Sequence, residues 1–137
     1  GGTFLSDEVQ YADATADRAT TAMEAIMQTH PEGIAIICAN NDDMAMAAAR
    51  AAQGHDAYKN TIFLGFNGDR AACEAILDGQ MTMSVAQMAY EMGYKAVETM
   101  VQVLDGETVD EFVDSGSDVV TPDNAQERLD TLKTQLH

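Results

Sequence analysis

The stretch IICANNDDMAMAA, residues 36–48, decides the fold. An apolar run meets four polar side chains at positions 40–43, two amides followed by two carboxylates, and a segment rich in Met and Ala begins at once. An apolar run of this kind is typical of a buried strand, and Met and Ala are good helix formers. The stretch therefore predicts a strand, a polar turn and a helix, and the polar turn either caps that helix or holds a ligand.

Short apolar runs alternate with longer amphipathic segments over the rest of the chain, which predicts β/α units around a mostly parallel sheet. We expect strands at residues 2–5 (weak), 34–39, 61–66, 81–86 and 118–120, and helices near 15–29, 43–53, 69–77 and 88–104. The uninterrupted run at 34–39 is typical of a strand covered on both faces. Thr121 and Pro122 have the N-cap and first-turn preferences that predict a last helix, whose apolar face ends at Leu136.

Composition excludes several classes of partner. The 137 residues suffice for one domain, and 7 Lys and Arg against 23 Asp and Glu give a formal net charge of −16. Such a surface repels phosphate backbones and anionic lipid, so no nucleic-acid or membrane-surface partner is expected. Cys38 and Cys73 lie in apolar patterns without metal-ligand spacing, and both are expected to be small buried side chains.

Each of three expected strands ends in an amide side chain: Asn41, Asn67 and Gln87. The carboxyl ends of parallel strands meet at one edge of a sheet, where ligands of such sheets bind, so these amides should converge. An amide both donates and accepts hydrogen bonds, which suits the hydroxyls of a sugar or polyol. The alternative is that these amides only form turns. We expect Asp42 and Asp69 to cap the helices that follow.

Catalytic and cofactor chemistry finds no support in the sequence. It contains no G-x-S-x-G, H-E-x-x-H, G-x-G-x-x-G or P-loop pattern, and its histidines, His30, His55 and His137, lie at a helix end, a loop and the terminus. The Asp42–Asp43 pair could indicate a phospho-acceptor domain, but that chemistry also needs a strand-end lysine, and none of the three lysines closes an apolar run. We therefore predict a binding module with no cofactor and no metal, rather than an enzyme.

Three longer segments together resemble the periplasmic sugar-binding proteins of the ribose and galactose type, whose superfamily includes the effector domain of the lactose repressor. They are ANNDDMAMAAARAAQ, IFLGFNGDRAACEAILDGQMTMSVAQ and MGYKAVETMVQVLDGE. The resemblance extends from about residue 17 to 124 and implies a doubly wound, Rossmann- or flavodoxin-like lobe of the periplasmic-binding-protein-like I fold. Members have two lobes with the sugar between them, and this chain corresponds to part of the C-terminal lobe.

The resemblance also implies roles for single residues. Asn41, Asn67 and Gln87 match positions that contact the sugar, although the family usually has Asp where Asn67 stands. A neutral amide in place of a carboxylate removes a charge-assisted partner for hydroxyls and should change or weaken the sugar preference. The family often stacks an aromatic ring on the sugar at the position of Ala14, and Tyr11 lies three residues before it.

The resemblance divides the chain at residue 121. Residues 1–121 form the sugar-binding lobe and 122–137 a C-terminal helix, while the helix within 88–106 belongs to the partner lobe of the family. Without that lobe, the apolar stripe of helix 88–104 would be an exposed patch that drives association. We expect this helix either to fold back onto its own sheet or to be exchanged within a homodimer.

The function that follows is a solute-binding component of an ABC-type importer, extracytoplasmic, with a monosaccharide or polyol ligand and a membrane permease as partner. The alternative is the effector-binding domain of a lactose-repressor-type transcriptional regulator. An enzyme on a flavodoxin-like sheet is a weaker third hypothesis, because no nucleotide or cofactor fingerprint occurs.

Overall fold

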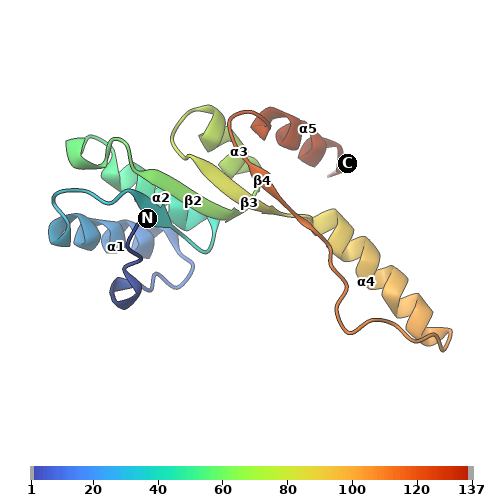
Figure 1. Ribbon diagram of the computed structural model, residues 1–137. Coiled ribbons are helices and arrows are strands. Elements are labelled where there is room, and N and C mark those ends of the chain that lie inside the picture. The colour runs from blue at the N-terminus through green and yellow to red at the C-terminus, as the bar shows by residue number, and fades with distance from the viewer. Residues whose placement is uncertain (1, 136–137) are drawn as a thin grey trace.

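Helices and strands alternate along the chain as expected. The computed structural model describes residues 2–135 (Figure 1). Its elements in chain order are α1 (Ala16–Thr29), β1 (Ile36–Cys38), α2 (Asp42–Ala52), β2 (Ile62–Asn67), α3 (Arg70–Leu77), β3 (Met83–Gln87), α4 (Ala89–Leu104), β4 (Ser117–Val120) and α5 (Ala125–Gln135). Two short 3-10 helices lie at Ser6–Glu8 and Asp56–Tyr58. The α/β class predicted from the sequence is confirmed.

The four strands form one sheet in the order β1-β2-β3-β4. β1, β2 and β3 are parallel, and β4 pairs antiparallel with β3. Parallel neighbours require a crossover between them, which α2 and α3 supply. The polar residues that follow β1, β2 and β3 therefore lie at the same edge of the sheet.

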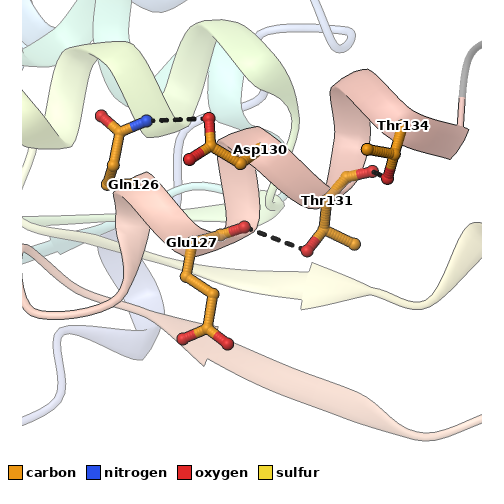
Figure 2. Close-up of a pocket in the computed structure, with 5 residues that line it drawn as sticks. All are labelled: Gln126, Glu127, Asp130, Thr131 and Thr134. Atoms are coloured by element: carbon orange, nitrogen blue, oxygen red, sulfur yellow. Dashed lines mark hydrogen bonds between the residues drawn. The ribbon is translucent and has the colours of Figure 1, made fainter.

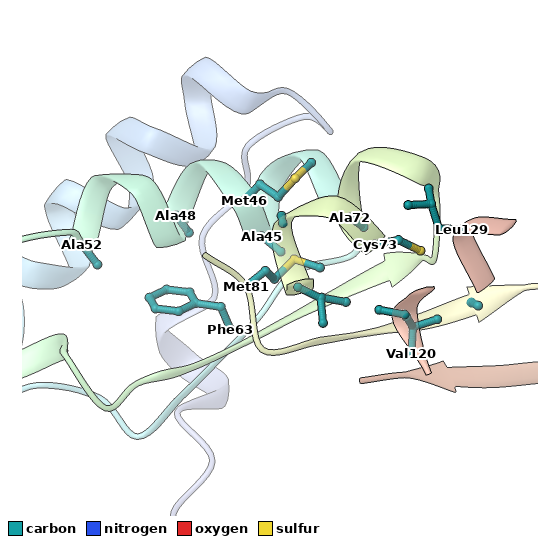
Figure 3. Packing of buried hydrophobic residues seen from close by; sticks show 14 of the residues in the cluster. Ala45, Met46, Ala48, Ala52, Phe63, Ala72, Cys73, Met81, Val120 and Leu129 are labelled. Atoms are coloured by element: carbon teal, nitrogen blue, oxygen red, sulfur yellow. The ribbon is translucent and has the colours of Figure 1, made fainter. Parts of the chain in front are cut away.

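One face of the sheet is buried beneath helices. Phe63, Ser84, Ala86 and Val120 point into this side and are at most 7% exposed. Figure 3 shows the side chains that meet them from α2, α3 and α5. They include Ala45, Met46, Ala48, Ala52, Ala72, Cys73 and Leu129. Small alanines on the inner side of α2 let that helix approach the sheet closely, and Met fills the irregular gaps.

The opposite face of the sheet is open. Ile36 is 50% exposed, and Val119 at the other side of the sheet is 44% exposed. The expectation that the run at 34–39 is covered on both faces is therefore wrong, because the core helices pack on one face only. Cys38 points to this open side and is exposed, also contrary to expectation, whereas Cys73 is buried as expected.

Helix α4 extends away from the rest of the protein (Figure 1). None of its residues is buried. Its contact with the returning segment is on its polar side, where Lys95 Nζ donates to the Asp114 carbonyl at 2.6 Å. The alternative in which this helix folds back onto its own sheet is therefore wrong in this structure, and its apolar stripe remains open to solvent.

Two details of the predicted elements are also wrong. Residues 2–5 form no strand. The last helix begins at Ala125 rather than directly after Thr121, because the Asn124 side chain accepts from the Thr121 amide at 2.8 Å and closes a turn first. Leu136 and His137 lie outside the described residues. No helix within residues 2–135 is both long enough and apolar enough to cross a membrane.

Candidate functional site

The carboxyl edge of the parallel strands brings two of the predicted site residues into contact. Asn67 ends β2 and Gln87 ends β3. Gln87 Nε2 donates to Asn67 Oδ1 at 2.7 Å, and both side chains are half-buried. This bond uses one side-chain N–H of Gln87 and one lone pair of Asn67 Oδ1. The pair therefore still offers two side-chain N–H groups of Asn67, one of Gln87 and the side-chain oxygen of Gln87. Donors and acceptors stand side by side, as a polyol requires.

Asn41 follows β1 at the same edge and has a structural task of its own. Its Oδ1 accepts from the Met44 amide at 2.8 Å, which makes Asn41 the N-cap of α2. Its Nδ2 donates to the Ala14 carbonyl at 3.3 Å. One N–H of Asn41 is left for another partner. The prediction that Asp42 caps this helix is wrong, whereas Asp69 does cap α3 by accepting from Ala72 at 2.9 Å.

Asp42 is instead a buried carboxylate that ties β1, β2 and β3 together behind the edge. It is 0% exposed. Its Oδ2 accepts from the Gly68 and Asp69 amides at 2.8 and 3.2 Å, and its Oδ1 accepts from Ser84 Oγ at 2.6 Å. The Gly68 amide also donates to Ser84 Oγ at 3.0 Å. These bonds link the turn after β1 to the turn after β2 and to the middle of β3.

Burial raises the pKa of the Asp42 carboxyl, and its hydrogen bonds from Ser84 and the two backbone amides oppose that rise. The close fit around the carboxylate explains two glycines. A Cβ at Gly65 would collide with Asp42 Oδ1, and a Cβ at Gly68 would collide with Ala86. Gly68 also has φ +65°, a conformation that favours glycine. The Asp42 cluster therefore depends on the absence of side chains at both positions.

The Asp42 cluster holds Asn67 in an unusual conformation. Asn67 has φ +129°, which is rare for a residue with a side chain. The next two residues, Gly68 and Asp69, are the ones whose amides Asp42 accepts. Backbone strain of this kind persists only where neighbouring structure fixes it, and it is concentrated at functional sites. The Asp42 hydrogen bonds therefore fix the turn that begins directly after Asn67.

Arg128 on α5 also forms hydrogen bonds at this edge of the sheet. The sequence analysis did not predict it. Its Nη2 donates to the Gln87 carbonyl at 2.9 Å and its Nε to the Gly68 carbonyl at 3.3 Å. Its Nη1 lies 3.7 Å from Met88 Sδ. The available signal in the sequence was a cation directly before the apolar-face residue Leu129, in a chain with only 7 Lys and Arg. Arg128 thus joins the turn after β2 to the turn after β3.

Position 14, where the family often has an aromatic ring, is occupied by Ala14. Ala14 has φ +58° and presents its carbonyl to Asn41. Tyr11 is 87% exposed, so its ring is available at the surface near this segment without packing in the core.

Two hollows on the described surface lie elsewhere. Figure 2 shows one on the outer face of α5, where Gln126 donates to Asp130 at 3.0 Å and Thr131 to the Glu127 carbonyl at 3.0 Å. All five residues that line it belong to this one helix. Another, of about 350 Å³, is lined by the end of α2 and the segments before β2 and β3, at the amino edge of the sheet. Neither includes Asn41, Asn67 or Gln87.

The described residues offer no group of three or more His, Cys, Asp or Glu side chains arranged to hold a metal ion. Asp42 already accepts three hydrogen bonds inside the protein. The amide groups at the carboxyl edge can form hydrogen bonds with a polar ligand.

Comparison with known proteins identifies a matching family and several similar proteins. The family described as "Periplasmic binding protein domain" matches residues 1–108. The ribose import binding protein of Escherichia coli is 35% identical over 101 residues, which are 73% of this chain and 33% of that protein. An ABC transporter solute binding protein from Mycobacterium smegmatis, solved with bound glycerol, is 33% identical with a TM-score of 0.72 over 86% of this chain and 41% of that one.

A second solved structure, an ABC transporter solute binding protein from Bacillus halodurans with bound myo-inositol, is 29% identical. Its TM-score is 0.73, and the match covers 87% of this chain and 41% of that one. The present chain thus spans about a third of the length of the curated ribose-binding relatives.

Proposed function

Because the chain belongs to the periplasmic binding protein family, we propose that its carboxyl edge forms one wall of a sugar- or polyol-binding site. In this proposal the protein is part of the solute-binding component of an ABC-type importer and performs no catalysis. The observation that carries the proposal is the Asn67–Gln87 amide pair, held at 2.7 Å at the end of two adjacent parallel strands.

The free hydrogen-bonding groups of this edge fit hydroxyl ligands. The Asn67–Gln87 pair offers N–H groups and a carbonyl, and Asn41 adds an N–H from the third strand end. A hydroxyl both donates and accepts, so neighbouring hydroxyls of one ring can each find a partner. All three side chains are neutral amides, so the edge should discriminate less sharply between sugars than an edge with an Asp at position 67.

The named relatives support this ligand class. One is called a ribose import binding protein, and the two solved structures hold glycerol and myo-inositol. All three compounds are polyhydroxylated and uncharged. These relatives are binding proteins of importers, which favours transport over the alternative of an effector domain of a transcriptional regulator.

The compartment and the macromolecular partner follow from the same family membership. An importer collects its solute outside the cytoplasm, so we place the protein in the periplasm or at the outer cell surface, with a membrane permease as partner. The net charge of −16 opposes nucleic-acid binding. Residues 88–106 would belong to a second lobe that closes over the sugar, and residues 122–137 would complete the present lobe.

We further propose that the isolated chain forms a homodimer through α4. The apolar stripe of this helix is exposed, with Val97 at 67% and Leu104 at 77%. An exposed apolar stripe of four turns is a recognised driver of association. Dimerisation through α4 would remove this stripe from water in the absence of a second lobe.

Isothermal titration with ribose, galactose and myo-inositol tests the proposed ligand class. We expect dissociation constants of about a millimolar or weaker, because a single wall leaves the ligand hydrated and its hydrogen bonds compete with water. The control is Gln87→Leu, which removes half of the amide pair and should abolish the signal. Micromolar affinity, or binding unchanged in Gln87→Leu, would contradict the proposal.

A further inference from the structure

Arg128 holds the backbone of both turns that follow the proposed ligand-binding amides. Its Nη2 donates to the Gln87 carbonyl at 2.9 Å, and its Nε donates to the Gly68 carbonyl at 3.3 Å. The first carbonyl belongs to Gln87 itself, and the second belongs to the residue that follows Asn67. One guanidinium thus spans the ends of β2 and β3, where Gln87 Nε2 donates to Asn67 Oδ1 at 2.7 Å.

The guanidinium of Arg128 bonds to these carbonyls rather than to a carboxylate. The chain contains 23 Asp and Glu residues, yet no salt bridge within residues 2–135 includes Arg128. A guanidinium presents its donors in a fixed planar fork and can bond two acceptors in set directions, whereas a Lys ammonium is a compact point charge. Position 128 therefore uses the geometry of arginine as well as its charge.

Gly68 is held through both of its backbone polar groups. Its N–H donates to Asp42 Oδ2 at 2.8 Å and to Ser84 Oγ at 3.0 Å, and its carbonyl accepts from Arg128. Gly68 has φ +65° and Asn67 has φ +129°. A strained backbone of this kind persists only where the surrounding structure fixes it. Arg128 and the Asp42 cluster therefore fix the same turn from opposite ends of one residue.

The attachment of α5 to the protein does not depend on these hydrogen bonds. Ala125 and Leu129 of α5 are buried and belong to the hydrophobic core. Figure 3 shows Leu129 beside Cys73 of α3. This apolar packing holds α5 in place whether or not the Arg128 head group donates, so the two bonds act on the turns at the carboxyl edge.

We infer that Arg128 is a positioning residue of the carboxyl edge, which holds the two turns so that the Asn67 and Gln87 amides meet. The inference rests on the proposed function and adds a residue that acts on the ligand through these two amides. Binding groups must be held within about 0.5 Å of their productive geometry by the residues that support them. We therefore expect sugar affinity to depend on Arg128 although its own donors point to the backbone.

NMR of the ligand-free chain tests the positioning directly. Arg128→Met keeps an apolar stem and removes every donor. We expect the side-chain NH₂ signals of Asn67 and Gln87 to shift, and those of Gln87 to exchange with solvent several-fold faster. The methyl signals of Ala125 and Leu129 should stay in place, because α5 remains packed. Arg128→Lys, which keeps the charge and loses the fork, should give smaller changes of the same kind.

Lys133→Met is the matched control, because it removes one positive charge from the same helix. Lys133 pairs with Asp130 at 3.3 Å and has no contact with either turn. Its variant should keep the wild-type NH₂ signals of Asn67 and Gln87. In a ribose titration, wild type and Lys133→Met should bind equally, and the dissociation constant should rise about fivefold or more in Arg128→Met, with Arg128→Lys between them.

The possible outcomes separate this inference from the proposed function. Displaced Ala125 and Leu129 methyls with unchanged amide signals in Arg128→Met would show that Arg128 only attaches α5, and would overturn the inference. If Arg128→Met does not fold, the same signals in Arg128→Lys decide. Equal amide shifts in Lys133→Met, or equal ribose affinity in wild type and the Arg128 variants, would also overturn it. The expected shifts without ribose binding by wild type would instead overturn the proposed function, and would leave Arg128 as the residue that holds the amide pair.

Discussion

Replacing the buried Asp42 by Ala should destabilise the fold more than any other single change at the polar turn. Asp42 is the acceptor for Ser84 Oγ at 2.6 Å and for the Gly68 and Asp69 amides at 2.8 and 3.2 Å. The Ser84 hydroxyl and the Gly68 amide are buried, so water cannot replace the lost carboxylate without rearrangement.

The magnitude follows from opposing contributions. A buried donor without an acceptor costs about 1–3 kcal/mol, and Asp42→Ala affects three donors, of which the Gly68 amide keeps Ser84 Oγ. Removing the buried carboxylate relieves the burial cost that raises its pKa. We expect a net loss of about 2–4 kcal/mol from Asp42→Ala and about 1 kcal/mol from Asp42→Asn, which keeps one acceptor oxygen.

Urea unfolding followed by circular dichroism measures these differences directly. For a slope near 2 kcal/mol per molar urea, Asp42→Ala should lower the midpoint by roughly 1–2 M. The matched control is Asp43→Ala, the exposed neighbour in the first turn of α2, which should change stability by less than about 0.5 kcal/mol. Equal midpoints for Asp42→Ala and Asp43→Ala would refute the reasoning that Asp42 organises the edge.

Three further predictions use the same assay. Burial raises the pKa of Asp42 in the folded state, so folding favours the protonated carboxyl. The stability of wild type relative to Asp42→Asn should therefore be greatest below about pH 4. This difference should fall as the pH rises through the folded-state pKa of Asp42. Gly68→Ala should cost about 2 kcal/mol or more because its Cβ collides with Ala86, whereas Gly79→Ala, at φ +71° with open space around it, should cost only about 1 kcal/mol. Asn41→Ala should cost about 1 kcal/mol through loss of the α2 cap, while Asn40→Ala should be neutral.

Each of these three predictions would be contradicted by a specific result. A pH profile that is parallel for wild type and Asp42→Asn would show that Asp42 has the same pKa in the folded and unfolded states. Equal costs for the two glycine variants would mean that backbone conformation alone matters at Gly68. An unchanged midpoint in Asn41→Ala would show that the cap of α2 is dispensable.

Local patterns predicted most of the fold because each depends on neighbours in sequence. The order of helices and strands, the parallel pairing and the position of Asn67 and Gln87 at one edge follow from periodicity and strand polarity. The segment 2–5 was predicted as a strand from residue type alone, yet it lacks a paired neighbour in the sheet. Strand formation depends on pairing, which composition does not contain.

The role of Asp42 could not be predicted because its partners are distant in sequence. Asn41 and Asp42 are both good N-cap residues, and a shift of one position decides which of them caps α2 and which is buried. The burial of Asp42 depends on Ser84, 42 residues later, and on two glycines that leave room for the carboxylate. The clue in the sequence was Ser84 itself, a hydroxyl within an otherwise apolar run.

The exposed surfaces were also beyond sequence patterns. An apolar run such as 34–39 predicts burial, but whether a second layer of helices covers the sheet depends on which elements the chain supplies. Here the core helices cover one face, and α4 packs on neither. The same hydrophobic pattern therefore describes both a strand that is buried on two faces and a strand that is buried on one.

The most direct test of the central claim is a titration of the side-chain amide signals by two-dimensional NMR with ribose or myo-inositol at millimolar concentration. The account predicts saturable shifts of the Asn67 and Gln87 NH₂ signals, with a smaller shift for Asn41, and none for Gln126 on the outer face of α5. Saturable shifts at Gln126, or at the hollow near the amino edge of the sheet, without any at Asn67 and Gln87 would contradict it.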